Sequence, residues 1–312
     1  MGTNKEVWIV GSKGMLGQEL ALLLKEKGVG VLESDLEVSI LDSDALSRFV
    51  EQNAYGSPTL APSNLRSLTG LRWIVNCAAY TAVDRAEEEP EICRRLNVEG
   101  PRNLARLAKS IGARLIHLST DYVFKGEVPP SGGKYTEEDT PAPQSVYGRT
   151  KLEGEEAVRE ELDLHIILRT AWLYGKYGKN FVYTMLNLMK ERDFVGVVAD
   201  QRGSPTWARD LAGAIYHIVQ SPNPRFGIYH FTNEGETTWF DFAREIYRLG
   251  RAYGMVNRVC EIRPLTTDQY PTKARRPAYS VLSKEKIKKD YGVPVPPWQE
   301  SLELFIGSLA NP

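Results

Sequence analysis

The chain has 312 residues, of which 42% are hydrophobic and 25% charged, as in an ordinary soluble globular protein. Its 39 Lys and Arg residues nearly balance 40 Asp and Glu residues, and the net charge of −1 excludes a protein whose bulk charge attracts nucleic acid or a membrane surface. Three widely spaced cysteines, Cys77, Cys93 and Cys260, fit neither a zinc site nor a disulfide framework and indicate a reducing compartment. The sequence opens without an apolar leader and has no run of ~20 apolar residues, so we expect a cytoplasmic protein that does not cross a membrane.

Short apolar segments alternate with segments of helical periodicity through the first half of the chain. The apolar segments predict strands at residues 7–10, 30–32, 73–78, 115–119 and 165–169. The periodic segments predict helices at residues 18–27, 45–52, 91–110 and 146–160. Because strands that alternate with helices form parallel sheets, we expect an α/β fold with a doubly wound, Rossmann-type parallel sheet.

The pattern becomes less regular after about residue 175. Helices are predicted at residues 181–190, 209–219 and 239–253, with linkers rich in Pro, Gly and Arg between them. We therefore expect a dinucleotide-binding Rossmann domain over residues 1–174 and a smaller C-terminal α/β lobe over residues 175–312, mainly for substrate. Residues 53–71 hold several Pro, Gly and Ser residues and are predicted to be a surface insertion in the first domain.

A glycine-rich segment, GSKGMLG at residues 11–17, joins the first predicted strand to the first helix. Glycines at this spacing allow a tight turn and let the backbone approach a pyrophosphate, which the amino end of the next helix attracts. A purely structural turn can have the same spacing, but the position after the first strand favours a dinucleotide site. The candidate cofactor residues in this loop are Gly11, Ser12, Gly14, Met15, Leu16 and Gly17.

Two acidic residues follow the second predicted strand at the distance where an acid binds the adenosine ribose. They are Glu33 and Asp35, and we favour Glu33. An acid here disfavours the 2′-phosphate of NADPH, whereas Lys13 in the glycine loop would attract it. The sequence therefore leaves NADPH and NADH as alternatives.

A second constellation lies at mid-chain, where Thr120 ends a predicted strand and Tyr147 precedes Lys151 by one helical turn. A phenol titrates near pH 10 and is a weak acid at neutral pH, but a neighbouring cation lowers its pKa. Such a phenol can donate a proton, the ammonium can also bind the nicotinamide ribose, and the threonine hydroxyl can orient the substrate oxygen. A tyrosine lying over a lysine stem gives the same spacing by chance, but the upstream glycine loop favours catalysis.

Together these motifs resemble the extended short-chain dehydrogenase/reductase family, and within it the members that reduce sugar nucleotides. The resemblance covers nearly the whole chain. The matching stretches are residues 11–17, 76–84, 96–97, 119–124, 146–154, 169–174, 200–206 and 270–277.

The resemblance implies NAD(P)H-dependent reduction of the C4 ketone of a dTDP-linked 4-keto-6-deoxy sugar, dTDP-4-dehydro-L-rhamnose, to dTDP-L-rhamnose. It implies that Thr120, Tyr147 and Lys151 are the catalytic residues. It also implies further cofactor contacts from Ser39, Ile40, Ala78, Ala79, Tyr80 and Thr81. It implies substrate contacts from Thr120, Asp121, Trp172, Arg275 and Arg276.

Two alternatives stay open at this point. One is a sugar-nucleotide epimerase or dehydratase of the same superfamily, in which Asp121 would be an additional acid or base. The other is a non-catalytic regulatory subunit resembling that of methionine adenosyltransferase, although a protein that binds the cofactor without catalysis needs no proton donor.

Some relatives in the family bind magnesium between subunits through glutamates. Glu19 matches one such position, but Arg209 occupies another. We therefore expect no metal, and either a monomer or a homodimer.

Overall fold

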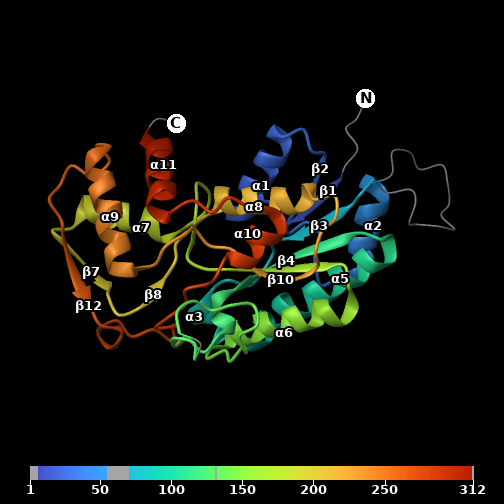
Figure 1. Ribbon diagram of the computed structural model, residues 1–312, viewed down its shortest axis with the longest axis horizontal. Coiled ribbons are helices and arrows are strands. Elements are labelled where there is room, and N and C mark those ends of the chain that lie inside the picture. The colour runs from blue at the N-terminus through green and yellow to red at the C-terminus, as the bar shows by residue number, and fades with distance from the viewer. Residues whose placement is uncertain (1–5, 55–69, 131, 311–312) are drawn as a thin grey trace.

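A six-stranded parallel sheet forms the centre of the computed structural model, which describes residues 6–54, 70–130 and 132–310 (Figure 1). Its strand order is β10-β5-β4-β3-β1-β2. The strands are β1 (Val7–Val10), β2 (Val31–Ser34), β3 (Trp73–Asn76), β4 (Arg114–Thr120), β5 (His165–Thr170) and β10 (Gly227–His230). The expected α/β fold with a Rossmann-type sheet is confirmed, while the greater part of the expected insertion at residues 53–71 lies outside the described residues.

Helices cover both faces of this sheet. In Figure 1, α1 (Met15–Glu26) and α8 (Ala208–Gln220) lie above it, and α5 (Gly100–Ile111) and α6 (Val146–Glu161) lie below it. α2 (Ser43–Ala54) shares the apolar core of α5 and α6, and α10 (Glu285–Tyr291) that of α1 and α8. Both cores are buried against the strands, and this removal of apolar area from water stabilises the sandwich. None of the helices in the described ranges combines the length and hydropathy needed to span a bilayer.

The segment predicted as one regular helix at residues 91–110 is divided in the structure. It consists of α4 (Pro90–Arg94), a π-helical turn (Arg95–Glu99) and α5, and the short helix α3 (Val83–Ala86) precedes it. The π-helical turn lies against α6 so closely that a Cβ on Gly154 would be 2.0 Å from the Asn97 carbonyl oxygen. The prediction of a regular helix was wrong here because a π-helical turn depends on this packing and not on local periodicity.

A smaller lobe contains α7 (Phe181–Glu191), α9 (Trp239–Ala252) and α11 (Trp298–Ala310), which gather to one side of the sheet in Figure 1. Its strands pair two by two. The pairs are β7 (Phe194–Val198) with β12 (Glu261–Leu265), β6 (Leu173–Tyr174) with β9 (Thr206–Trp207), and β8 (Arg202–Gly203) with β11 (Thr237–Thr238). The lobe has its own buried core, in which Met185, Phe242 and Phe305 take part.

The expected division at residue 174 does not describe two later segments. The strand β10 pairs in parallel with β5, and α8 shares an apolar core with α1, so both belong to the unit built on the six-stranded sheet. Periodicity does not predict β10, because a segment of four residues with only two large apolar side chains is too short to give a signal.

Candidate active site

A cavity of about 750 Å³ lies where β1 and β4 end, at the carboxyl edge of the sheet. Its wall includes the glycine loop, Thr120, Tyr147 and Lys151. This edge is where open parallel sheets bind ligands, because the chain diverges there into loops. Two motifs more than a hundred residues apart therefore share one cavity.

The glycine loop has a conformation that only glycine tolerates. Gly11 has φ +78°, and a Cβ on it would lie 2.7 Å from the Ala78 nitrogen. A Cβ on Gly17 would lie 2.2 Å from the Gly11 carbonyl oxygen, so the start of α1 packs directly on the turn. Because the first N–H groups of a helix have no helical acceptor, this end of α1 suits an anion such as a pyrophosphate. The loop thus fits the phosphates of a dinucleotide.

Of the two candidate ribose acids, the structure brings Asp35 to the cavity and leaves Glu33 outside it. Glu33 is exposed on β2 and forms an ion pair with Lys25 at 2.5 Å. The Asp35 carboxylate accepts a hydrogen bond from the Lys13 backbone N–H at 2.8 Å, which attaches it to the glycine loop. Glu33 is exposed because it lies within β2 on the face turned to solvent, whereas Asp35 follows the last residue of that strand and reaches the cavity.

Most of the other expected cofactor residues line the same cavity. They are Gly11, Gly14, Met15, Leu16, Gly17, Ser39, Ile40, Ala78, Ala79 and Thr81. Ser12 and Tyr80 do not line it: Ser12 is buried under the loop, and the Tyr80 hydroxyl donates a hydrogen bond to Glu89 at 2.6 Å. The Tyr80 backbone N–H donates a hydrogen bond to the Asn97 side chain at 2.9 Å, which links the loop after β3 to the π-helical turn.

Local packing brings Tyr147 to the end of β4. Tyr147 lies in the first turn of α6, which Ser145 caps by accepting a hydrogen bond from the Gly148 N–H at 3.1 Å. A Cβ on Gly148 would lie 2.3 Å from the Tyr122 carbonyl oxygen, so α6 begins against the turn that follows Thr120. The Tyr122 and Tyr147 rings meet edge to face with centroids 5.5 Å apart. These two contacts hold the first turn of α6, and with it the Tyr147 ring, against Tyr122.

The pKa values of Tyr147 and Lys151 differ from those that the spacing of the two residues predicts. Burial raises the pKa of Tyr147 above its usual value, although the Thr120 hydroxyl partly offsets the effect. The Lys151 ammonium donates to the Leu118 carbonyl oxygen at 2.5 Å, and burial lowers the pKa of Lys151 to about 8. The expected lowering of the phenol pKa by Lys151 is not found in this structure, because desolvation dominates and the ammonium is bound to the backbone.

Asp121 is the buried carboxyl group of the site. It follows Thr120, whose hydroxyl donates to the Asp121 Oδ1 at 3.0 Å, and it lines the cavity. Burial raises the pKa of Asp121 to about 6, against the effect of the Ser280 and Thr120 hydroxyls. A carboxyl group of this kind can bind a substrate hydroxyl.

Trp172 forms an aromatic wall of the cavity in an unusual conformation. Among the described residues it alone, apart from glycines, has a positive φ, +48°. Its indole stacks on Trp239 of α9 with centroids 3.6 Å apart, and a Cβ on Gly203 would lie 2.5 Å from it. Strained backbone of this kind persists only where the surroundings hold it, so the packing against Trp239 and Gly203 fixes the position of Trp172 in the cavity wall.

The two expected arginines do not line the cavity. Arg276 donates to the Tyr122 hydroxyl at 3.0 Å and to Asp84 at 2.7 Å, so its guanidinium is occupied within the protein. Arg275 is exposed and contacts Gln144 at 3.4 Å. Arg276 therefore contacts the cavity only indirectly, through the hydrogen bond that fixes the position of the wall residue Tyr122.

Asn97 is a buried residue of the site region that sequence reasoning did not single out as functional. Its side chain accepts from the Tyr80 N–H at 2.9 Å and donates to the Thr150 hydroxyl at 3.2 Å. It thereby links the loop after β3 to the helix that carries Tyr147. A buried asparagine inside a predicted amphipathic helix was the available signal, because such a group needs several partners.

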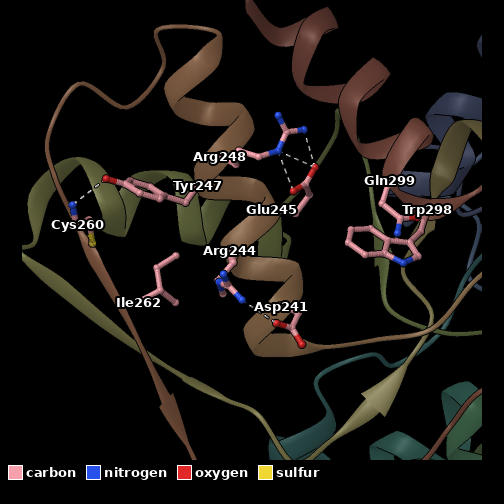
Figure 2. A pocket seen from close by; sticks show the side chains of 9 residues that line it. All are labelled: Asp241, Arg244, Glu245, Tyr247, Arg248, Cys260, Ile262, Trp298 and Gln299. Carbon is pink, nitrogen blue, oxygen red and sulfur yellow. Dashed lines mark hydrogen bonds and ion pairs between the residues drawn. The ribbon is translucent and has the colours of Figure 1, made fainter.

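A second hollow, of about 620 Å³, lies beside α9 and is lined partly by Tyr247, Ile262 and Trp298 (Figure 2). Figure 2 shows its arginines beside acidic residues of the same helix. Arg248 pairs with Glu245 at 2.7 Å and Arg244 with Asp241 at 3.4 Å. None of the expected site residues lines it, so the cavity at the sheet edge is the candidate active site.

A Rossmann sheet with a glycine loop and a Thr–Tyr–Lys set around one cavity defines the class of short-chain dehydrogenases/reductases. The family model for the RmlD substrate binding domain matches residues 5–311, and the chain belongs to this family. A dTDP-4-dehydrorhamnose reductase of Aggregatibacter actinomycetemcomitans is 39% identical over 95% of this chain and 96% of its own. The expected relationship to extended short-chain reductases of sugar nucleotides is confirmed.

Two solved structures have the same fold. A dTDP-4-dehydrorhamnose reductase from Clostridium acetobutylicum matches with a TM-score of 0.85 and 39% identity over 97% of this chain and 99% of its own. The reductase of the same name from Bacillus anthracis, solved in complex with NADP, matches with a TM-score of 0.85 and 35% identity over 98% and 100%.

Proposed function

We propose that this chain is an NAD(P)H-dependent reductase that converts the C4 ketone of dTDP-4-dehydro-L-rhamnose to the alcohol of dTDP-L-rhamnose. The shared cavity carries this proposal, since the glycine loop and the Tyr147–Lys151 pair line the same space. Membership of the family and the printed names of its relatives support the choice of substrate.

The residues of the cavity fit a nicotinamide dinucleotide, which when bound supplies the hydride. Gly11, Gly14 and Gly17 would hold its phosphates, and Asp35 would bind the adenosine ribose. Ala79 and Thr81 would line the path toward Tyr147. We propose that these residues, with Lys151, make up the cofactor site.

The protein's own groups would complete the reduction at the ketone oxygen. The Thr120 hydroxyl orients this oxygen, and the Tyr147 phenol donates a proton to it as negative charge develops. Asp121 and Trp172 bind the sugar, so that the carbonyl carbon faces the hydride donor. Because Thr120, Asp121 and Lys151 are buried, the polar contacts that they make act in a low dielectric and are stronger than in water.

The test mixes pure protein with NADH or NADPH and a dTDP-4-keto-6-deoxy sugar and follows the nicotinamide absorbance. The proposal expects steady consumption of cofactor and one alcohol formed for each cofactor oxidised. An epimerase or dehydratase would convert the sugar without net consumption, because it recycles a bound cofactor. A regulatory binding protein would bind the cofactor and convert nothing.

We infer a cytoplasmic location, since the proposed reaction uses soluble nucleotides and Cys77, Cys93 and Cys260 are free thiols. The balanced net charge of −1 supports the absence of a nucleic-acid partner. Arg209 lies 3.9 Å from Glu19, so a cation already neutralises the position where some relatives bind metal. Whether the chain is a monomer or a homodimer is measurable by sedimentation.

A further inference from the structure

His117 lies directly beneath the candidate active site and has no role in the reaction described above. It is on β4, fully buried, and pairs in register with Asn76 on β3. One ring nitrogen, Nδ1, lies 3.1 Å from the Asn76 Nδ2, and the other, Nε2, lies 3.5 Å from the Lys151 Nζ. The imidazole therefore connects a strand end to the ammonium of the proposed proton-transfer pair.

The hydrogen bonds of Asn76 determine which ring nitrogen carries the proton. The Ala78 N–H donates to the Asn76 Oδ1 at 3.1 Å, so the amide oxygen is used and the NH₂ group faces His117. An NH₂ group can only donate, and the His117 Nδ1 must accept. A neutral imidazole has a single N–H, which is then on Nε2 and points toward Lys151.

The ring stays neutral because burial and the neighbouring Lys151 hold the pKa of His117 well below its usual range. An N–H that faces an ammonium finds no lone pair, whereas an N–H that faces a neutral amine can donate to it. The His117 tautomer thus favours the amine form of Lys151. The Leu118 carbonyl opposes this effect by accepting from the ammonium at 2.5 Å.

Other groups near Lys151 also influence its charge. Glu155, on the same helix, favours the ammonium, but its carboxylate is shared with Arg169 at 2.6 Å and with the Ser119 hydroxyl at 2.5 Å. Cys93, from α4, also favours the ammonium, and burial favours the amine most strongly. From β4, the His117 side chain contacts Lys151, with its Nε2 at 3.5 Å from the Lys151 Nζ.

We propose that His117, held by Asn76 as its Nε2-protonated tautomer, is a positioning residue that makes the Lys151 ammonium easier to deprotonate. The proposal rests on the proposed reductase function for its consequence, which is that Lys151 can exchange a proton near neutral pH during turnover. Its structural content, the tautomer, is independent of any substrate.

The first test reads the tautomer directly. The chain has only 4 histidines, so ¹⁵N-labelled histidine gives few signals, and His117→Gln identifies those of His117 by their loss. We expect the ring proton on Nε2 and a step in the ring ¹⁵N shifts near pH 8, as the neighbouring Lys151 titrates. A proton on Nδ1, a doubly protonated ring at pH 7, or no step would overturn the proposal.

The second test reverses the tautomer with Asn76→Asp. The carboxylate accepts from the Ala78 N–H and also from the His117 Nδ1–H, so Nε2 becomes an acceptor for the ammonium. We expect the alkaline limb of kcat to move up by about one pH unit, a tenfold change in proton concentration. The added charge alone would act without the ring, so the same change is also made in the His117→Gln background.

A shift that is as large in the double variant as in Asn76→Asp contradicts the tautomer mechanism, because the charge then explains it. A shift of the alkaline limb that appears in Asn76→Asp but not in the double variant supports the tautomer mechanism, because it then requires the imidazole. If wild-type protein oxidises no cofactor with the dTDP sugar, the proposed function fails while the ¹⁵N experiment still decides the tautomer. The same ¹⁵N experiment decides the matter in wild-type protein if Asn76→Asp does not fold.

Discussion

Tyr147, Lys151 and Asp121 are three ionisable side chains that line one cavity. Burial shifts the pKa of each in the direction that favours its uncharged form. The pKa of the phenol rises, that of the ammonium falls to about 8, and that of the carboxyl group rises to about 6. Desolvation acts in this direction on acids and bases alike. At neutral pH the wall keeps a protonated phenol, which is the form that can donate a proton to a ketone oxygen.

Replacing the phenol tests this assignment. Tyr147→Phe removes the hydroxyl and keeps the ring that contacts Tyr122. We expect kcat to fall by about 10²–10⁴-fold, because general acid catalysis is lost, while the affinity for NADH changes little. Steady-state rates and fluorescence titration measure the two quantities, and a variant with wild-type turnover would rule out the role.

Cofactor preference depends on residues at the end of β2. The Asp35 carboxylate lines the cavity, and the Lys13 ammonium is paired with Glu37 at 3.0 Å, which leaves it less available to a 2′-phosphate. We expect a preference for NADH, and a drop of about tenfold in kcat/KM for NADH in Asp35→Ala, since a charged hydrogen bond is lost. The control is Glu33→Ala, which should behave as wild type; a larger effect in the control than in Asp35→Ala would contradict this assignment.

At the level of elements, the contact between α6 and the π-helical turn decides where α6, which carries Tyr147 and Lys151, lies. Asn97 joins the turn to Thr150 on α6, and Gly154 lets the two backbones approach. Larger side chains would separate the helix from the turn and displace the phenol from the end of β4. Rigid packing of this kind is what holds catalytic groups within a fraction of an ångström.

A single methyl group tests this contact. In Gly154→Ala the new Cβ would lie 2.0 Å from the Asn97 carbonyl oxygen, so we expect a loss of about 1–3 kcal/mol in the free energy of unfolding from overpacking. Gly213→Ala is a matched helical control, since nothing lies within 4 Å of its Cβ position, and it should stabilise by up to about 1 kcal/mol. Urea denaturation measures both, and equal effects would show that the contact is not tight.

On the scale of the whole molecule, Glu234 joins three distant segments. Its carboxylate pairs with Lys134 at 2.9 Å, Lys288 at 2.7 Å and the buried Lys284 at 3.4 Å. Burial lowers the pKa of Lys284 to about 8, and Glu234 is the acid that compensates its charge. This cluster fastens the loop before α6 and the start of α10 to the chain that follows β10.

The lysines hold the pKa of Glu234 far below its usual value of 4.5, against the effect of burial. A group whose folded pKa is lowered stabilises the protein above its unfolded pKa, and that stability is lost as the pH falls below about 4.5. We expect the free energy of unfolding at pH 7 to be lower by about 1–3 kcal/mol in Glu234→Gln, because Lys284 loses its partner. We also expect this free energy to change less with falling pH in the variant than in wild type. Urea denaturation at pH 7 and in acid measures this, and parallel pH curves for variant and wild type would contradict it.

Local patterns in the sequence determined strands β1 to β5 of the six-stranded sheet, the glycine loop and the Tyr147–Lys151 spacing. These features follow from side-chain periodicity, from glycine's conformational freedom and from one helical turn, all of which act over a few residues. The resemblance to the family, and not these local patterns, named Trp172 and Asp121 as substrate candidates, and both line the cavity.

Only the tertiary structure brought Asp35 and not Glu33 to the cavity, directed Arg276 to Tyr122 instead of the cavity, and added β10 to the sheet. It also brought His117 between Asn76 and Lys151. The physical reason is that each of these outcomes depends on which segments pack together, since the direction of a side chain, its partners and its desolvation are set by neighbours that are distant in the chain.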